Sequence, residues 1–261
     1  MSVDVVTLRE RPDLRPLVFR DALRDIWPEF MLHDATADLY FDDHAFDRYQ
    51  DFAFAVIDPA APEVPVGRAF SVPFAFGGDR AELPDTGWDG VIRWAHQDAM
   101  TGSPANALSA LEISLLPAYR GRGVARLVLD RMRRQAHALG CQRVFASVRP
   151  TAKHCEPFLP MAAYVARRSA DGLAADPWLR THEQAGGRIV KIAPTSMVIA
   201  GTLAEWRRWT GLPLAQSRPV AIPGGLAPLH VSVEQDSAVY VEPNVWMEHS
   251  PLESTRATPA S

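Results

Sequence analysis

One stretch, residues 111–139, constrains the fold more than any other part of the chain. Apolar residues alternate with others from Leu111 to Leu115, which is typical of a β-strand. Two glycines, Gly121 and Gly123, come next, and an apolar stripe with helical spacing follows them. The sequence therefore predicts a strand, a glycine-rich turn and a helix in direct succession.

A turn of this kind is suited to binding phosphate. Glycine lets backbone N–H groups converge on one point, and the start of a helix carries the positive end of the helix dipole. Arg120, Arg122 and Arg126 add positive charge. The two commonest phosphate loops do not fit, because no lysine follows Gly123 and Arg126 stands where a dinucleotide fingerprint needs a small residue. A plain strand-to-helix turn with surface arginines is the alternative interpretation.

The run from Leu115 to Ala125, LLPAYRGRGVA, resembles the cofactor motif of the GNAT superfamily of N-acetyltransferases. There, a strand, a proline and Y-R-G-x-G-[IV]-[GA] open a helix that holds the pyrophosphate of acetyl-CoA. The resemblance implies an α/β fold, a GNAT-like mixed, twisted central sheet of about seven strands flanked by helices. It implies acetyl-CoA as co-substrate, bound by Ile113, Leu115, Arg120, Gly121, Arg122, Gly123, Val124 and Ala125.

The same resemblance implies an enzyme that moves an acetyl or related acyl group from acyl-CoA to a primary amine of a small molecule, by direct attack. Two alternatives remain open: an acetyltransferase for protein lysines or N-termini, and a non-catalytic module that binds acyl-CoA. In the superfamily, a backbone N–H at a strand bulge binds the thioester carbonyl, and motif register puts that donor near Leu115. We expect a monomer or a homodimer.

Glu112 is the only carboxylate on the strand that precedes the turn. Strict alternation would point it opposite to Leu111 and Ile113. We interpret Glu112 as a candidate general base, acting directly or through water on the attacking amine. An ordinary residue of the polar strand face is the alternative.

His182 lies four residues before Gly186, where family members usually carry a tyrosine that protonates the departing thiolate. Imidazole can donate a proton near neutral pH, so His182 is a candidate for that role. Counting from Gly187 instead selects Glu183, and a structural histidine on a short helix is the other alternative.

Local sequence patterns predict strands at 3–8, 52–57, 66–76, 143–148, 229–233 and 239–245, and helices at 19–30, 88–100 and 203–209. The resemblance implies a further helix, placed at 177–185 because Asp176 suits its cap and Pro177 its first turn, and a strand after it at 188–192. The strand–helix–strand order predicts that the strands at 111–115 and 143–148 are parallel at their start. The resemblance implies that they then splay apart. Residues 33–51 are acidic and aromatic, which suits either a cationic acceptor amine or a solvated helix with a few core aromatics.

The predicted organisation is a single GNAT-like domain over residues 1–249, followed by a disordered tail at 250–261. Its core comprises 1–148 and 176–195, with an insertion at 149–175 and an enlarged C-terminal part at 196–249. The last part carries a polar and aromatic group that suits either the substrate site or a buried network: Glu242, Asn244, Trp246 and His249.

Composition excludes several classes of protein. A net charge of −4 and a pI near 6.1 argue against a nucleic-acid surface. Two cysteines, Cys141 and Cys155, cannot build a disulfide framework, and the histidines lack metal-ligand spacing. The sequence shows neither a signal peptide nor a membrane span. We therefore expect a cytoplasmic protein without a metal and without a membrane or nucleic-acid partner.

Overall fold

The computed structural model describes residues 2–253. The β-strands are β1 (Asp4–Thr7), β2 (Ala53–Asp58), β3 (Ala61–Phe74), β4 (Ala107–Leu115), β5 (Arg143–Val148), β6 (Arg188–Thr202), β7 (Pro219–Val220), β8 (Leu229–Ser232) and β9 (Ser237–His249). The α-helices are α1 (Arg15–Val18), α2 (Asp21–Arg24), α3 (Asp38–Phe41), α4 (Asp43–Phe46), α5 (Gly87–Thr101), α6 (Val124–Ala138), α7 (Met161–Val165), α8 (Pro177–Gln184) and α9 (Leu203–Thr210). Short 3₁₀ helices are η1 (Pro12–Leu14), η2 (Glu29–His33), η3 (Ala35–Ala37), η4 (Asp47–Tyr49), η5 (Arg80–Glu82), η6 (Pro117–Tyr119) and η7 (Lys153–Cys155).

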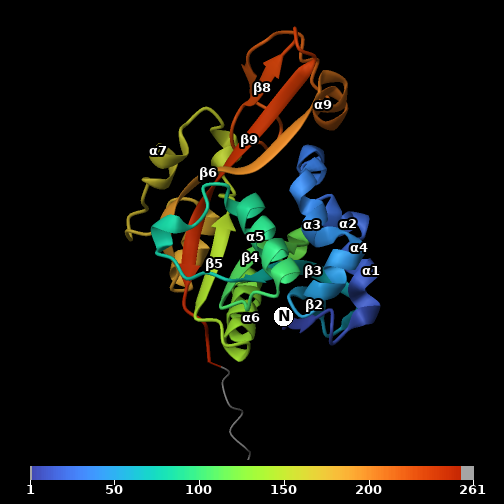
Figure 1. Ribbon diagram of the computed structural model, residues 1–261, viewed down its shortest axis with the longest axis vertical. Helices are drawn as coiled ribbons and strands as arrows, with labels where there is room; N and C mark the ends of the chain where they lie inside the picture. Colours follow the sequence, from blue (N-terminus) through green and yellow to red (C-terminus); the bar gives the residue numbers. More distant parts are fainter. Residues whose placement is uncertain (1, 254–261) are drawn as a thin grey trace, which may run out of the picture.

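The strands form one mixed sheet in the order β1-β2-β3-β4-β5-β9-β8-β7, and β6 pairs with β9 (Figure 1). Only the pair β4–β5 is parallel among the described strands; the other pairs are antiparallel. The mixed sheet flanked by helices confirms the predicted fold class. The sheet has nine strands within the described residues rather than about seven, because the C-terminal part adds strands to the sheet.

The helix predicted over residues 19–30 is wrong. Helix α2 ends at Arg24, and η2 begins only after Pro28. Proline lacks the N–H that a continuing helix needs and pushes the preceding residue, Trp27, out of the helical region. The break frees the Trp27 side chain to reach across to Glu112, where its indole N–H donates at 3.1 Å.

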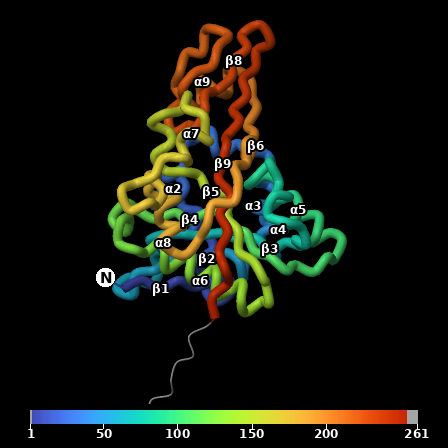
Figure 2. The backbone as a smooth tube through the Cα atoms, turned by 90° about the vertical axis from the view of Figure 1, so that its left-hand side faces the viewer, coloured from blue at the N-terminus to red at the C-terminus, as the bar shows by residue number. Residues whose placement is uncertain are grey.

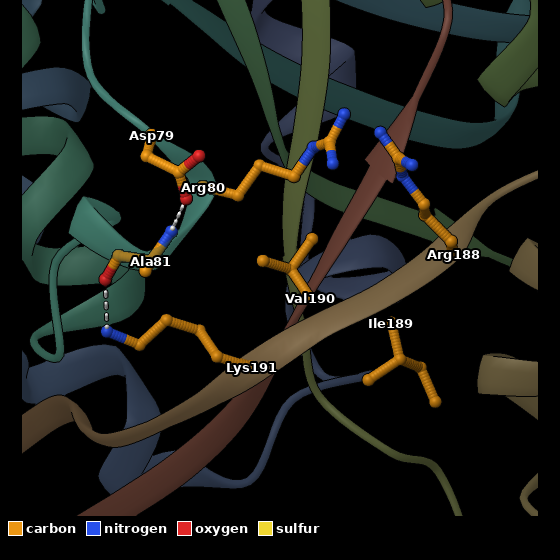
Figure 3. Close-up of a pocket in the computed structure, with 7 residues that line it drawn as sticks. All are labelled: Asp79, Arg80, Ala81, Arg188, Ile189, Val190 and Lys191. Carbon is orange, nitrogen blue, oxygen red and sulfur yellow. Dashed lines mark hydrogen bonds between the residues drawn. The ribbon is translucent and has the colours of Figure 1, made fainter.

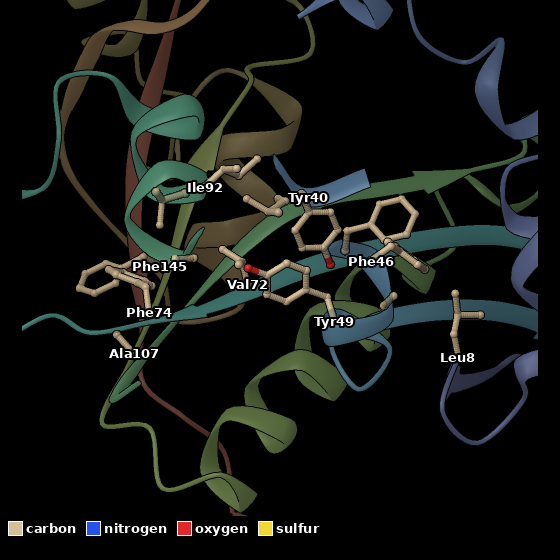
Figure 4. Close-up of a cluster of buried hydrophobic side chains, with 14 of the residues drawn as sticks. Leu8, Tyr40, Phe46, Tyr49, Val72, Phe74, Ile92, Ala107 and Phe145 are labelled. Atoms are coloured by element: carbon tan, nitrogen blue, oxygen red, sulfur yellow. The ribbon is translucent and has the colours of Figure 1, made fainter. Parts of the chain in front are cut away.

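Two hydrophobic clusters cover the two faces of the sheet, and β2 alternates between them as a strand buried on both sides. Ala53, Ala55 and Ile57 pack with the cluster on the side of α5, whereas Phe54 and Val56 pack on the side of α6. The first cluster is rich in aromatic rings (Figure 4). Its aromatic members come from both the short N-terminal helices and the sheet: Tyr40, Phe46, Tyr49, Phe70, Phe74, Phe76, Phe145 and Trp246.

The C-terminal part forms an arm that extends the sheet. Strands β6 and β9 run from the core along the long axis of the molecule, and β8 and α9 cover their far ends (Figures 1 and 2). The arm has its own cluster around Trp206, which is fully buried and donates its indole N–H to the Ala238 carbonyl at 2.9 Å. Strand β6 therefore crosses the predicted boundary between residues 195 and 196, and the division into core, insertion and extension stays a prediction.

The predicted insertion is tied to α8 by Asp176. This carboxylate caps α8 by accepting from the Trp178 and Leu179 N–H groups, and it also accepts from Tyr164 Oη at 2.8 Å. At the other end of the chain, Ser250 contacts Arg133 of α6. The tail predicted to be disordered lies, from residue 254 on, outside the described residues.

Candidate active site

The glycine-rich turn has the geometry of an anion cradle. Gly121 and Gly123 have φ values of +69° and +76°, a conformation that glycine adopts without strain. A Cβ built at either position would meet no described atom within 4 Å, so both face open space. Gly123 is the N-cap of α6, and no side chain from the described residues caps that helix. The first N–H groups of α6 are thus oriented for a phosphate.

Contacts around the turn fix its position against the sheet. Tyr119 donates its hydroxyl to Asp58 Oδ2 at 2.8 Å, at the end of β2. Arg120 folds back so that its Nε donates to the Leu115 carbonyl at 2.8 Å. These bonds attach the cradle to β2 and β4. Tyr119 and Arg120 of the motif therefore hold the turn against the sheet.

Strands β4 and β5 separate as the resemblance implies. Their parallel ladder ends at Ala110 and Ala146, while β4 continues to Leu115 and β5 to Val148. The gap leads from the centre of the sheet toward the cradle at the start of α6.

A bulge in β4 lies at Leu111, four residues before the expected position near Leu115. Phe70 pairs with Glu112 and Ser71 pairs with Ala110, so Leu111 is the extra residue. The bulge breaks the alternation, and the expectation that Glu112 points opposite to Leu111 is therefore wrong. Leu111 packs in the cluster on the α5 side, and Glu112 contacts Arg68, whose guanidinium lies 5.4 Å from the Phe70 ring of that cluster.

A single cavity of about 1410 Å³ joins the cradle to the gap between the strands and to the N-terminal helices. This volume exceeds the roughly 300–1,000 Å³ of a site for one small ligand, and it suits two substrates bound together. Of the eight residues expected to bind the cofactor, all except Arg122 line the cavity. Both candidate catalytic residues, Glu112 and His182, line it as well.

Glu112 is held in a buried ion pair. Its Oε1 accepts from Arg68 Nε at 2.6 Å and from Trp27 Nε1 at 3.1 Å. Among residues 2–253, the one partner of its Oε2 is Arg68 Nη2, at the longer distance of 3.5 Å. The Arg68 and Glu112 side chains are 7% and 9% exposed, so both charges lie largely out of water. Oε2 is thus the oxygen with lone pairs available to a substrate.

His182 is buried against a second histidine. Its Nδ1 lies 2.9 Å from His249 Nε2, and its ring packs edge-on against Trp178. Burial, and secondarily the neighbouring His249, hold the pKa of His182 well below its usual value. Burial also lowers the pKa of His249, to about 4. Both rings are therefore neutral at pH 7, and one N–H is shared between them.

The position of the shared proton determines whether His182 Nε2 carries a hydrogen that it can donate toward the cavity. If His249 Nε2 donates, His182 Nδ1 accepts and His182 Nε2 carries the other hydrogen. That Nε2 atom is buried and has no hydrogen-bond partner within residues 2–253. A neutral ring in this tautomer donates a hydrogen bond rather than a whole proton. Sequence reasoning had placed His249 in a general polar cluster and gave no signal for this pairing.

The acidic, aromatic segment 33–51 divides between the two expected roles. Tyr40 and Tyr49 are core residues, as the solvated-helix alternative requires. Phe41 and Asp38 instead line the cavity. Asp38 is exposed and has no ion-pair partner within the described part of the chain, so its charge is available at this end.

The polar and aromatic group of the C-terminal part also divides, between the cavity and the buried core. Glu242 and Asn244 line the cavity, whereas Trp246 belongs to the aromatic core and donates its indole N–H to the Pro84 carbonyl at 2.9 Å. Glu242 is fully buried and paired with Arg149, which follows β5 and also lines the cavity. Arg68, Arg149 and Trp27 are among the polar cavity residues that sequence reasoning missed, since no local pattern marks them.

A second, smaller cavity of about 480 Å³ lies between η5 and β6 (Figure 3). Its cations already have partners: Arg80 and Arg188 pair with Glu248, and Lys191 pairs with Asp85. No group of His, Cys, Asp or Glu side chains in residues 2–253 is arranged to hold a metal ion. Within the same residues, no helix has both the length and the apolar character needed to cross a bilayer.

Comparisons with known proteins agree with this geometry. Residues 20–159 match the family model described as "Acetyltransferase (GNAT) family". Over 269 residues the chain is 30% identical to an arginine N-acetyltransferase, avaD, of Aspergillus versicolor, covering 93% of this chain and 92% of the relative.

Two solved structures share the fold at low identity. The loading GNATL domain of CurA from Lyngbya majuscula is 16% identical, with a TM-score of 0.52 over 96% of this chain and 98% of that domain. The GphF GNAT-like decarboxylase, solved with isobutyryl-CoA, is 16% identical, with a TM-score of 0.50 over 97% of this chain and all of the other. With the family match over more than half of its length, the chain belongs to the GNAT family of acetyltransferases and is an acyl-CoA-dependent acyltransferase.

Proposed function

We propose that the protein transfers an acetyl group from acetyl-CoA to a primary amine of a small molecule. The continuous cavity carries this proposal, because it connects a phosphate cradle at Gly121 and Gly123 with a chamber beyond the gap between β4 and β5. The chamber is lined by Trp27 and Phe41, and the unpaired Asp38 gives it an available negative charge. Such a lining suits a compact, cationic acceptor. The relative named as an arginine N-acetyltransferase supports the same class of acceptor.

In the proposed reaction the neutral amine attacks the thioester carbonyl directly, forming the amide bond as the carbon–sulfur bond breaks. The proton released by the amine passes to Glu112 Oε2 or to water, since Oε2 is the less engaged carboxylate oxygen. A backbone N–H of β4 close to the bulge at Leu111 stabilises the developing oxyanion, a contribution of roughly 3–4 kcal/mol. His182 Nε2–H donates a hydrogen bond to the departing sulfur.

The test is release of free thiol from acetyl-CoA with a panel of amines, with the product identified by mass spectrometry. The panel contains arginine, lysine, a polyamine, an amino sugar and a lysine-containing peptide. Turnover of one of the small amines, and none by the Gly123→Val variant, is the expected result. Acetylation of the peptide alone would favour a protein acetyltransferase. Tight acetyl-CoA binding without any turnover would favour a non-catalytic module.

A further inference from the structure

Arg149 follows β5 directly and lines the cavity at the point where β5 has left β4. Its guanidinium is fixed from several sides. Nε donates to both Glu242 oxygens, at 2.9 and 3.1 Å, and Nη2 donates to the Gly224 carbonyl. The guanidinium carbon also lies 5.9 Å from the centre of the Trp27 ring. Arg149 therefore has one well-defined position.

The arm holds the acidic partner just as firmly. Glu242 accepts from Tyr240 Oη at 2.6 Å and from Asn244 Nδ2 at 3.2 Å. Tyr240 Oη in turn accepts from the Leu226 N–H at 2.7 Å. These contacts fill the lone pairs of Glu242 with partners from the protein itself, so the carboxylate has little capacity left for a ligand.

The ion pair is neutral as a whole, but its two ends are not equally accessible. The Arg149 side chain is 19% exposed, whereas the Glu242 side chain is 0% exposed. Burial alone would lower the pKa of Arg149, but Glu242 and Tyr240 outweigh burial and raise it, so the guanidinium stays charged. Nε and Nη2 donate to Glu242 and Gly224, and the Tyr240 hydroxyl also interacts with the guanidinium, so Nη1 is the nitrogen that these two protein acceptors leave least engaged. A ligand in the cavity thus meets a positively charged group with N–H capacity to donate.

We propose that Arg149 Nη1 binds the carboxylate of the acceptor, so that the acceptor is a free amino acid rather than a simple amine or a peptide-bound residue. This inference rests on the proposed function. Arg149 lies beside the opening of the gap, where the attacking amine must approach the thioester. An α-amino acid carries its carboxylate one carbon away from its amine. The unpaired Asp38, on the N-terminal helices, is then available for a cationic side chain.

A carboxylate on the acyl group, as in a malonyl thioester, has the same chemistry and would make the same contact. The two sources differ in which substrate loses affinity when Arg149 is changed. A contact to the acceptor affects the KM of the amine, whereas a contact to the acyl group affects the choice between acyl-CoA donors.

The experiment compares arginine with argininamide and agmatine, which lack the carboxylate, and lysine with lysinamide. Each is assayed with acetyl-CoA and with malonyl-CoA. The test variant is the double substitution Arg149→Gln with Glu242→Gln, which removes both charges and leaves no unpaired buried carboxylate. Arg149→Lys keeps the charge and tests whether the guanidinium geometry is needed. Arg208→Gln, an exposed arginine of α9 outside the cavity, is the control for the loss of one positive charge.

We expect the wild type to favour each amino acid over its carboxylate-free analogue by roughly 10- to 100-fold in kcat/KM, mostly through KM. That preference should fall to near unity in the double variant and persist in Arg208→Gln. An equal rate with amino acids and amides in the wild type overturns the inference, as does a malonyl-CoA preference that only the Arg149 variants lose. If no amine is acetylated, the proposed function fails. Calorimetric titration of arginine and argininamide into the protein with coenzyme A then still tests the subsite.

Discussion

Replacing one partner of the buried pair between Arg68 and Glu112 should destabilise the protein strongly, whereas replacing both partners together should not. The atoms are 2.6 Å apart, and the side chains are only 7% and 9% exposed. Glu112→Gln leaves the Arg68 charge with the Val18 carbonyl, at 3.2 Å, and the rings of Phe19 and Phe70 as partners. The loss of one partner of a buried pair costs about 3–5 kcal/mol. For a chain of this size we expect Tm to fall by roughly 6–20 °C.

A double-mutant cycle measures this coupling. Glu112→Gln, Arg68→Met and the double variant are unfolded in urea and followed by tryptophan fluorescence. The double variant should be no less stable than either single variant, which corresponds to a coupling of at least about 3 kcal/mol when each single variant costs about 3–5 kcal/mol. If the losses of unfolding free energy in the two single variants simply add in the double variant, with a coupling below about 0.5 kcal/mol, the assignment of a stabilising pair is refuted.

The same variants test whether Glu112 acts as a general base or only as a structural partner of Arg68. If Glu112 takes the proton of the amine, Glu112→Gln should lower kcat/KM by roughly 10²–10⁴, with acetyl-CoA affinity unchanged. Arg68→Met should then retain most of the rate. Equal losses of kcat/KM in both variants, in proportion to their losses of stability, would show that Glu112 is only a structural partner of Arg68.

Three further outcomes are expected. Gly121→Val and Gly123→Val should each abolish acetyl-CoA binding in calorimetry while circular dichroism stays unchanged, because a β-branched residue is strained at these positive φ values; unaltered affinity would contradict the cradle. His182→Phe should slow turnover by roughly tenfold to a hundredfold without weakening coenzyme A binding, and His182→Gln, which keeps an N–H donor, should lose less. His249 is neutral when folded but binds a proton when unfolded below pH 6.5, so stability falls from about pH 6.5 to 4, by on the order of 3 kcal/mol. Acid titrations of unfolding should show a smaller slope in this window for His249→Phe, and an unchanged slope would count against the buried neutral pair.

The parts of the fold that local patterns encode were predictable from the sequence. Strand β5 has the predicted limits, Arg143–Val148, and α8 starts at the predicted Pro177 under the Asp176 cap. Apolar periodicity and capping act over a few residues, so a single chain records them. The helix predicted at 19–30 failed because its apolar spacing continues through Pro28, where the backbone cannot follow.

The candidate site was only half predictable, because its pairings connect distant parts of the chain. Arg68 and Glu112 are 44 residues apart, His182 and His249 are 67 apart, and Arg149 and Glu242 are 93 apart. No spacing rule links such residues, and only the strand order brings them together. The bulge at Leu111 was equally hidden, since an extra residue leaves the apolar pattern of β4 intact while it turns Glu112 to the other face.

The position of β9 has a consequence for the order in which the protein can mature. This strand lies between β5 and β8 and also pairs with β6, yet the ribosome makes it after all of them. Until residues 237–249 emerge, β5 and β6 have open edges, which are prone to associate with other chains. His182 also lacks its histidine partner and Arg149 its carboxylate during that time. If His182 and Arg149 have the roles proposed above, a nascent chain can contain the complete glycine-rich turn and still lack activity until β9 has joined the sheet.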